Sequence, residues 1–208
     1  MDIFVRVLKE VLGVVYQYSG MALVFSVIFM FTYMQICDNG FKKTARRWIS
    51  TFKESSEFRR VFICVFYIVI LMGRTLFCRA MTGSALSNVL GPWFYDKKGN
   101  FLTEGIDNLL LFIPVTPLLI RALEKKLFKD KPVTFWRTLG IGSLMSFGIS
   151  AAIEVIQLFL KIGSFQLSDL AFNTAGGILG TLIYYVCHKI HSIGSGRKNK
   201  IKDKSDKL

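Results

Sequence analysis

The chain has 208 residues, of which 52% are hydrophobic and 20% charged, and its formal net charge is +13. This hydrophobicity excludes a disordered chain, and four cysteines are too few for a disulfide-rich secreted scaffold. The length suggests one domain, and two classes remain: a basic nucleic-acid-binding protein, or a membrane protein with several helices.

The first predicted element is a membrane-spanning helix over Val11–Cys37. These 27 consecutive residues carry no charge, whereas about 20 apolar residues are enough to cross a bilayer. A signal peptide is the alternative, but its apolar region has roughly 7–15 residues and ends near a small-residue cleavage site. The run is longer than that and lacks a convincing site, so we expect a retained helix.

A basic segment follows the first span. Trp48, Ile49 and Phe52 stand there between Lys and Arg residues, a pattern that indicates a short helix lying in the membrane interface. A solvated loop that only sets the topology is an equally good interpretation. In either case basic residues next to a span attract anionic membrane lipids, which we therefore expect as partners.

Four further apolar segments complete the predicted bundle. In chain order they cover Val61 to about Thr82, Ile106–Leu123, Thr138–Leu160 and Leu170–Cys187. Pro114 and Pro117 remove two backbone donors from the third of the five spans and should kink or break it. In the fifth span Gly176 and Gly180 form a GxxxG pattern, with Gly177 beside them, which permits close helix approach.

The basic residues alternate along these spans. With the N-terminus outside, the expected cytoplasmic segments hold 20 of the 27 Lys and Arg residues and the outer segments hold 7. Cytoplasmic loops of membrane proteins carry such an excess. We therefore predict an all-α, polytopic helical membrane bundle of about five transmembrane helices, N-out and C-in. The positive charge becomes a topology signal, and no nucleic-acid partner is expected.

Polar residues of the predicted spans converge on the outer side of the membrane. The candidate site consists of Arg74, Asn108, Glu154, Gln157, Asp169 and Asn173. Glu154 and Gln157 are three residues apart, and Asp169 and Asn173 four apart, so each pair shares a helix face. Arg74 is the expected counter-charge for Glu154 or Asp169, because an unpaired buried charge is costly. The alternative is a network that only clamps the helices together.

The pattern of titratable residues predicts no metal site, no cofactor and no catalytic group. His188 and His191 are three apart but lack a third ligand, which favours simple placement at the membrane interface. Of the cysteines only Cys78 falls near the outer face, so no disulfide is expected. Arg79 is placed at the outer interface.

Two stretches carry family motifs. One is NLLLFIPVTPLL from Asn108, and the other is IEVIQLFLKIGSFQLSDLAFNTAGGILG from Ile153 to Gly180. The second combines Glu-x-x-Gln, a loop, and Asp-x-x-x-Asn-Thr-x-Gly-Gly-x-x-Gly. Together they resemble the VanZ-like family of small bacterial membrane proteins. Ile162 stands where the family usually has Arg, and Thr116 replaces a Gly, so the chain resembles a divergent member.

The resemblance implies a multi-pass protein of the bacterial cell membrane that is associated with resistance to teicoplanin-type glycopeptides. The motif positions carried over are Asn108, Pro114, Glu154, Gln157, Asp169, Asn173 and Gly177. We accordingly divide the chain into an N-terminal helix with a basic cytoplasmic loop (1–60), a VanZ-like four-helix membrane domain (61–188) and a basic cytoplasmic tail (189–208).

Three functions remain open. The favoured one is a non-catalytic envelope factor whose outer polar site binds a lipid-linked cell-wall precursor, a lipid or a lipid-tailed glycopeptide. The second is a membrane enzyme acting on a lipid-linked envelope substrate, with Glu154 and Asp169 as acid and base. The predicted site contains no His and no nucleophile beside a base, which disfavours this enzyme. The third is a structural or transport-associated subunit.

Overall fold

The computed structural model describes the backbone of residues 3–37, 41–77, 86, 88–95, 99–129 and 131–205. Over these residues the chain is helical without a β-strand, apart from one isolated antiparallel bridge between Tyr95 and Phe101. Three predictions, on Cys78, on Arg79 and on the end of the second span near Thr82, lie outside the described residues.

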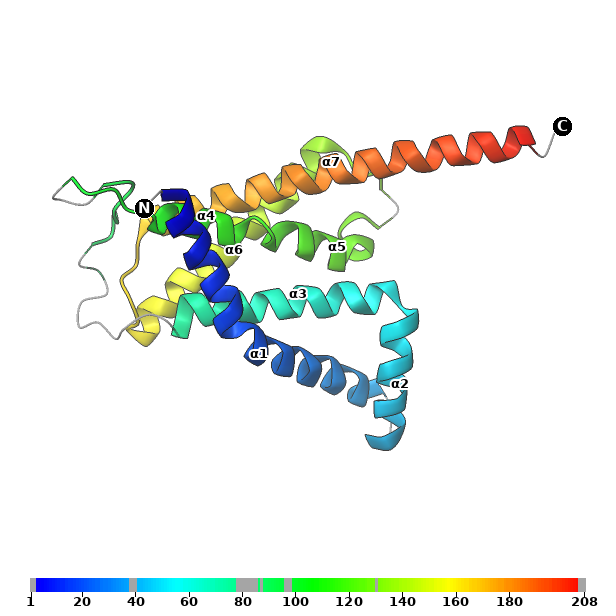
Figure 1. Ribbon diagram of the computed structural model, residues 1–208, viewed down its shortest axis with the longest axis horizontal. Coiled ribbons are helices and arrows are strands. Elements are labelled where there is room, and N and C mark those ends of the chain that lie inside the picture. Colours follow the sequence, from blue (N-terminus) through cyan, green and yellow to red (C-terminus); the bar gives the residue numbers. More distant parts are fainter. Residues whose placement is uncertain are drawn as a thin grey trace.

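The helices follow one another as an antiparallel bundle (Figure 1). They are α1 (Ile3–Cys37), α2 (Phe41–Glu54), α3 (Ser56–Met72) with its π-helical continuation η1 (Gly73–Phe77), α4 (Glu104–Phe112), α5 (Val115–Phe128), α6 (Phe135–Leu160) and α7 (Leu167–Ser205). Among the described residues, five segments are long and apolar enough to cross a membrane, with α3 joined to η1 and α4 joined to α5. The predicted all-α bundle with five spans is confirmed.

The helices run beyond the predicted spans. Helix α1 begins at Ile3 because Arg6 and Glu10 form an ion pair of 3.1 Å across one helical turn, so these charges stabilise the helix instead of ending it. Helix α7 begins at Leu167 and continues to Ser205, and no proline interrupts it.

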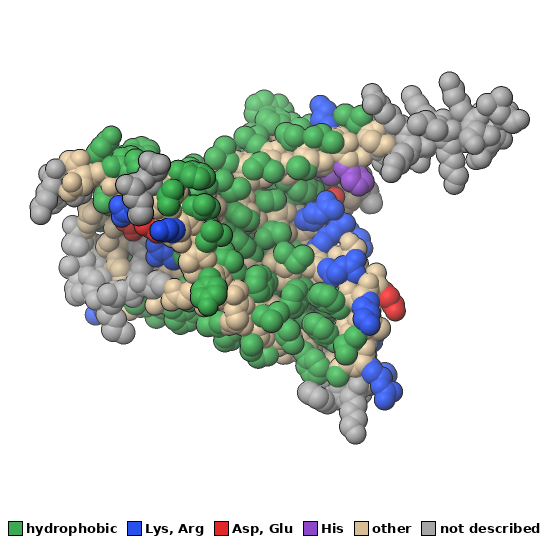
Figure 2. Space-filling view, viewed as in Figure 1, with side chains coloured by type: hydrophobic (Ala, Val, Ile, Leu, Met, Phe, Trp, Pro, Cys, Tyr) green, Lys and Arg blue, Asp and Glu red, His purple; other side chains and the backbone are tan. Residues whose placement is uncertain are grey.

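The surface of the bundle is apolar and much of its interior is polar. Ser146 and Ser150 have no exposed surface, whereas Tyr16 is 88% exposed and Phe159 is 81% exposed. Hydrophobic side chains cover the visible face of the bundle, and Lys and Arg gather at the end where α2 and the end of α5 lie (Figure 2). This distribution suits a protein whose flanks contact lipid.

Two apolar clusters join α1 to the other helices. The larger cluster contains Val14, Tyr18 and Ala22 of α1 with Ile70, Leu71, Leu111, Phe112, Val115 and Ile153. This cluster contains residues from both sides of position 60, the predicted boundary between the N-terminal segment and the four-helix domain. In the smaller cluster the apolar face of α2 packs Trp48 and Phe52 against Phe58 and Phe62 of α3, with Met30 and Met34 of α1 nearby.

The two prolines coincide with a break between α4 and α5. Helix α4 ends at Phe112, and Pro114 is the N-cap residue of α5. The Tyr67 hydroxyl donates a hydrogen bond of 2.7 Å to the Leu111 carbonyl at this break. Gly176 and Gly180 of α7 lie directly against the Leu109 and Ile113 carbonyls, where any side chain would overlap the backbone. Pro117 has no backbone N–H and cannot donate a hydrogen bond to the Ile113 carbonyl. The Cα–H of Gly180 can approach this carbonyl closely and make a weak contact with it instead.

Candidate functional site

Helices α6 and α7 meet along two matching stripes of small and polar residues. The α6 stripe repeats every fourth residue and contains Thr138, Gly142, Ser146, Ser150 and Glu154. The α7 stripe has the same spacing and contains Asp169, Asn173, Gly177 and Thr181. All of these residues are buried. A spacing of four residues keeps each stripe on one helix face, and we call the interface between them the α6–α7 seam.

The contacts along the seam fix an antiparallel register. Gly142 packs against Thr181, and Gly177 packs against Ser146, each so closely that a Cβ on the glycine would overlap its neighbour. One helical turn further, the Asn173 amide donates to the Ser150 hydroxyl at 3.0 Å. The Ser146 hydroxyl also donates to the Asn173 carbonyl at 3.0 Å. The next turn in this register places Glu154 opposite Asp169, so a neutral seam ends in two carboxylates.

Glu154 accepts a hydrogen bond from the loop that joins the two helices. The backbone N–H of Gln166 donates to its carboxylate at 2.9 Å, and Glu154 is only 1% exposed. The loop turns back through Lys161 (φ 54°) and Gly163 (φ 69°), both in the left-handed region. The Glu154 side chain therefore holds the connection between α6 and α7 in place.

Asp169 connects α7 to α4. The Asn108 amide donates to its carboxylate at 2.9 Å, and both side chains are buried. Asn108 and Asp169 belong to the two sequence stretches that carry the family motifs and are 61 residues apart, so these stretches meet in one buried cluster. The structure brings Asn108, Glu154, Asp169 and Asn173 together through the α6–α7 seam.

The other two predicted site residues lie at the edge of this cluster. The Gln157 amide donates to the Thr75 carbonyl of η1 at 2.7 Å, which joins α6 to the π-helical turn. Arg74, the preceding residue, interacts electrostatically with Asp107 of α4. In the described part of the chain no ion pair joins Arg74 to Glu154 or Asp169.

A second charged cluster was missed at the level of sequence. The carboxyl groups of Glu10 in α1 and Asp107 in α4 lie close together, Arg6 forms an ion pair with Glu10, and the charge of Arg74 acts on Asp107. The Thr103 hydroxyl donates to Glu10 at 3.5 Å. Two acidic side chains thus lie between two arginines in this cluster. Glu10 directly precedes the predicted first span, Val11–Cys37, and its spacing of four from Arg6 is a helix signal that extends the helix toward the N-terminus.

The α6 stripe was also missed, apart from Glu154. Thr138, Gly142, Ser146 and Ser150 were treated as ordinary span residues, although their spacing of four is visible in the sequence. His188 and His191 lie on α7 about five to six helical turns beyond the acidic end of the seam. No group of three or more metal-ligating side chains occurs among the described residues.

Sequence comparison agrees with the motifs. The sequence model of the VanZ/LLP1 family matches residues 21–188, which extends from within α1 to the second half of α7. Protein VanZ of Enterococcus faecium is 35% identical to the chain over 99 residues, which are 46% of this chain and 52% of that protein. The chain thus spans about half the length of this curated relative. No solved structure matches the chain.

Proposed function

The chain belongs to the VanZ/LLP1 family, a family of bacterial membrane proteins, and on this premise we propose that it is an envelope factor that protects the cell against teicoplanin-type glycopeptides. Membership and the five apolar helices support a multi-pass protein of the bacterial cell membrane. We further propose that the ligand site is formed by Glu154 and Asp169 and faces the outer side of the membrane.

The observation that carries the proposal is the acidic end of the α6–α7 seam. Over its other turns the seam packs with Gly, Ser, Thr and Asn, which are sufficient for close helix packing in a membrane. Only the last turn uses carboxylates, Glu154 and Asp169. Ionisable groups in membrane spans are costly and are functional candidates for that reason. We assign these two carboxylates to ligand recognition.

The orientation follows from the basic residues. Lys and Arg side chains gather at the end of the bundle where α2 and the end of α5 lie (Figure 2), whereas Glu154 and Asp169 belong to the opposite end, where α6 ends and α7 begins (Figure 1). From the positive-inside rule we propose that the basic end is cytoplasmic and that the carboxylates lie toward the outer leaflet. Their oxygens are acceptors for amine and amide donors. The proposed ligand is the polar part of a lipid-tailed envelope molecule, either a lipid-linked cell-wall precursor or the lipid-tailed drug, and its binding limits the access of the drug to its target.

The experiment is complementation of a deletion strain, scored on teicoplanin and vancomycin side by side. The wild-type chain should raise tolerance to the lipid-tailed drug selectively. Glu154→Gln and Asp169→Asn should each remove that gain at an unchanged level of protein in the membrane. The control is Glu57→Gln, which removes a carboxylate from an exposed ion pair with Lys125 at the other end of the bundle.

Each alternative has a distinct outcome. If both carboxylate variants protect fully, the site has no part in the function. If they lower the amount of folded protein, the cluster serves structure, as the structural-subunit hypothesis requires. If overexpression changes the composition of lipid-linked precursors and the variants do not, the enzyme hypothesis is favoured instead.

A further inference from the structure

A cavity of about 580 Å³ lies between α3, α5 and α7 at the basic end of the bundle. The first α7 residue in the wall of the cavity is Ile183, whereas Asp169, at the acidic end of the seam, lies in the first turn of α7. The two sites are therefore separated by more than three helical turns. Nothing in the α6–α7 seam uses the cavity. Its chemistry is therefore a separate question from that of Glu154 and Asp169.

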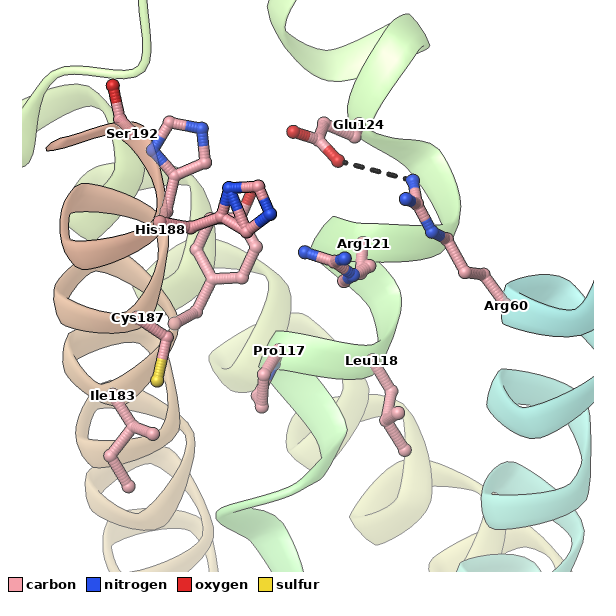
Figure 3. A pocket seen from close by; sticks show the side chains of 11 residues that line it. Arg60, Pro117, Leu118, Arg121, Glu124, Ile183, Cys187, His188 and Ser192 are labelled. Atoms are coloured by element: carbon pink, nitrogen blue, oxygen red, sulfur yellow. Dashed lines mark ion pairs between the residues drawn. The ribbon is translucent and has the colours of Figure 1, made fainter. Parts of the chain in front are cut away.

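The cavity has a polar end and an apolar end. At the polar end Arg121 extends from α5 toward His188 of α7, and Ser192 lies beyond it (Figure 3). At the other end Leu118 of α5 and Ile183 of α7 line the walls (Figure 3). Ile183 is 51% exposed on the flank of the bundle, so the apolar end opens toward the surface that contacts lipid. A ligand that fills both ends has a polar head and an apolar chain.

The polar end supplies hydrogen-bond donors and positive charge. Arg60 of α3 forms an ion pair with Glu124 at 3.6 Å. Arg121 has no such acidic partner in the described part of the chain. The Tyr184 hydroxyl is buried in the same wall, near Arg121 and Glu124, and makes no hydrogen bond of acceptable geometry within the described residues. A guanidinium without an ion pair and a phenol without a well-aligned hydrogen bond are a suitable pair of donors for a phosphate group.

We infer that this cavity binds one anionic phospholipid, with its phosphate at Arg121 and Tyr184 and an acyl chain along Leu118 and Ile183. Basic pockets between membrane helices at the cytoplasmic side recognise phospholipid headgroups in this way. Arg60, whose charge is balanced by Glu124, and His188 add hydrogen-bond donors around the phosphate. Ser192 lies where a glycerol headgroup hydroxyl would extend. The bound lipid bridges α5 and α7 at the basic end of the bundle, beyond the α6–α7 seam.

The test uses the purified full chain in a neutral detergent. Thermal unfolding is measured with added dioleoyl phosphatidylglycerol, with dioleoyl phosphatidylcholine, and with sodium phosphate alone. Phosphatidylglycerol should raise the unfolding temperature and remain bound in native mass spectrometry at one molecule per chain. Arg121→Gln should weaken its binding by about tenfold, the loss of one charge-assisted hydrogen-bonded contact. Lys131→Gln, which removes an equal charge from an exposed position outside the cavity, should not.

Three results would overturn the inference. They are equal stabilisation by phosphatidylcholine, unchanged phosphatidylglycerol binding in Arg121→Gln, and a full effect of sodium phosphate alone, which would indicate a free-phosphate site. A second measurement needs no variant. Cys187 lines the cavity and is exposed, so bound phosphatidylglycerol should slow its alkylation by N-ethylmaleimide, read at the Cys187 peptide. Equal alkylation rates in the two lipids would reject the site.

Discussion

The side-chain amide of Asn108 donates a hydrogen bond of 2.9 Å to the carboxylate of Asp169, and both groups are buried in the bundle. This bond joins the first turns of α4 to the first turn of α7, two elements separated by the whole of α5 and α6. A buried carboxylate depends on such donors, because it cannot exchange them for water. Asn108 therefore supports the position of Asp169 at the end of the α6–α7 seam.

Replacing Asn108 with alanine should destabilise the bundle by about 2 kcal/mol, since a buried carboxylate loses a donor. The free energy of unfolding of the purified protein, measured in mixed micelles with increasing denaturing detergent, would show the change. Asn88→Ala, at an exposed position, is the matched control and should leave the unfolding free energy nearly unchanged. An equally stable Asn108→Ala variant would mean that Asp169 does not depend on this bond.

Glycine at position 177 should be required by the α6–α7 seam. A Cβ there would overlap the Ser146 hydroxyl, so Gly177→Ala should cost about 1–3 kcal/mol through overpacking. Gly148→Ala on α6 meets open space and should be neutral or stabilising by up to about 1 kcal/mol.

A double-mutant cycle separates this contact from other effects of the glycine. If the overlap with Ser146 is the cause, Ser146→Gly should recover part of the loss in the Gly177→Ala background. Additive free energies of unfolding in the two single variants and the double variant would show that the two positions do not interact.

The spans could be predicted from the sequence because charge is costly in lipid. Five runs poor in charge mark the helices, and the prolines mark the break between α4 and α5. Several helices extend beyond the predicted spans, since a charge ends a membrane span but does not end a helix. Arg6 and Glu10 illustrate this, as they pair within α1.

The site could be predicted only in part. The shared faces of Glu154 with Gln157 and of Asp169 with Asn173 follow from spacing, but the partner of a long side chain depends on tertiary packing. Arg74 interacts with Asp107, on the same helix turn as Asn108, and the contact of Asp107 with Glu10 requires α1 to lie beside α4. Nothing local in the sequence specifies that neighbour.

Tyr67→Phe tests how the bundle compensates for the broken helix. The Tyr67 hydroxyl donates to the Leu111 carbonyl at the α4–α5 break, and its loss should lower the unfolding free energy by about 1 kcal/mol. Tyr33→Phe removes the same hydroxyl from a side chain that is 63% exposed and should have no measurable effect. Equal stability of the two variants would show that the carbonyl finds another donor.

We expect Glu154 to have a structural role, as a hydrogen-bond acceptor, that does not depend on its charge. Glu154→Ala removes the acceptor of the Gln166 N–H, so this amide should exchange hydrogen about tenfold faster or more. Glu154→Gln keeps a carbonyl acceptor and should preserve the protection. The Ile162 N–H, which donates to the Gln157 carbonyl at 3.0 Å in the same loop, is the internal control. Rapid exchange of Gln166 in wild type would contradict the bond.

The proposed orientation makes an independent prediction, which matters because the function assigned to Glu154 and Asp169 needs them near the outer leaflet. Asn88→Cys lies in the exposed segment before α4, and Lys131→Cys lies in the exposed segment between α5 and α6. A membrane-impermeant maleimide should label the first variant in intact cells, and the second only after the membrane is opened. The parent chain gives the background from its own four cysteines. Positive charge holds the basic segments inside, so the reverse labelling would place the acidic end of the seam in the cytoplasm, and an outer-leaflet ligand could not then reach it.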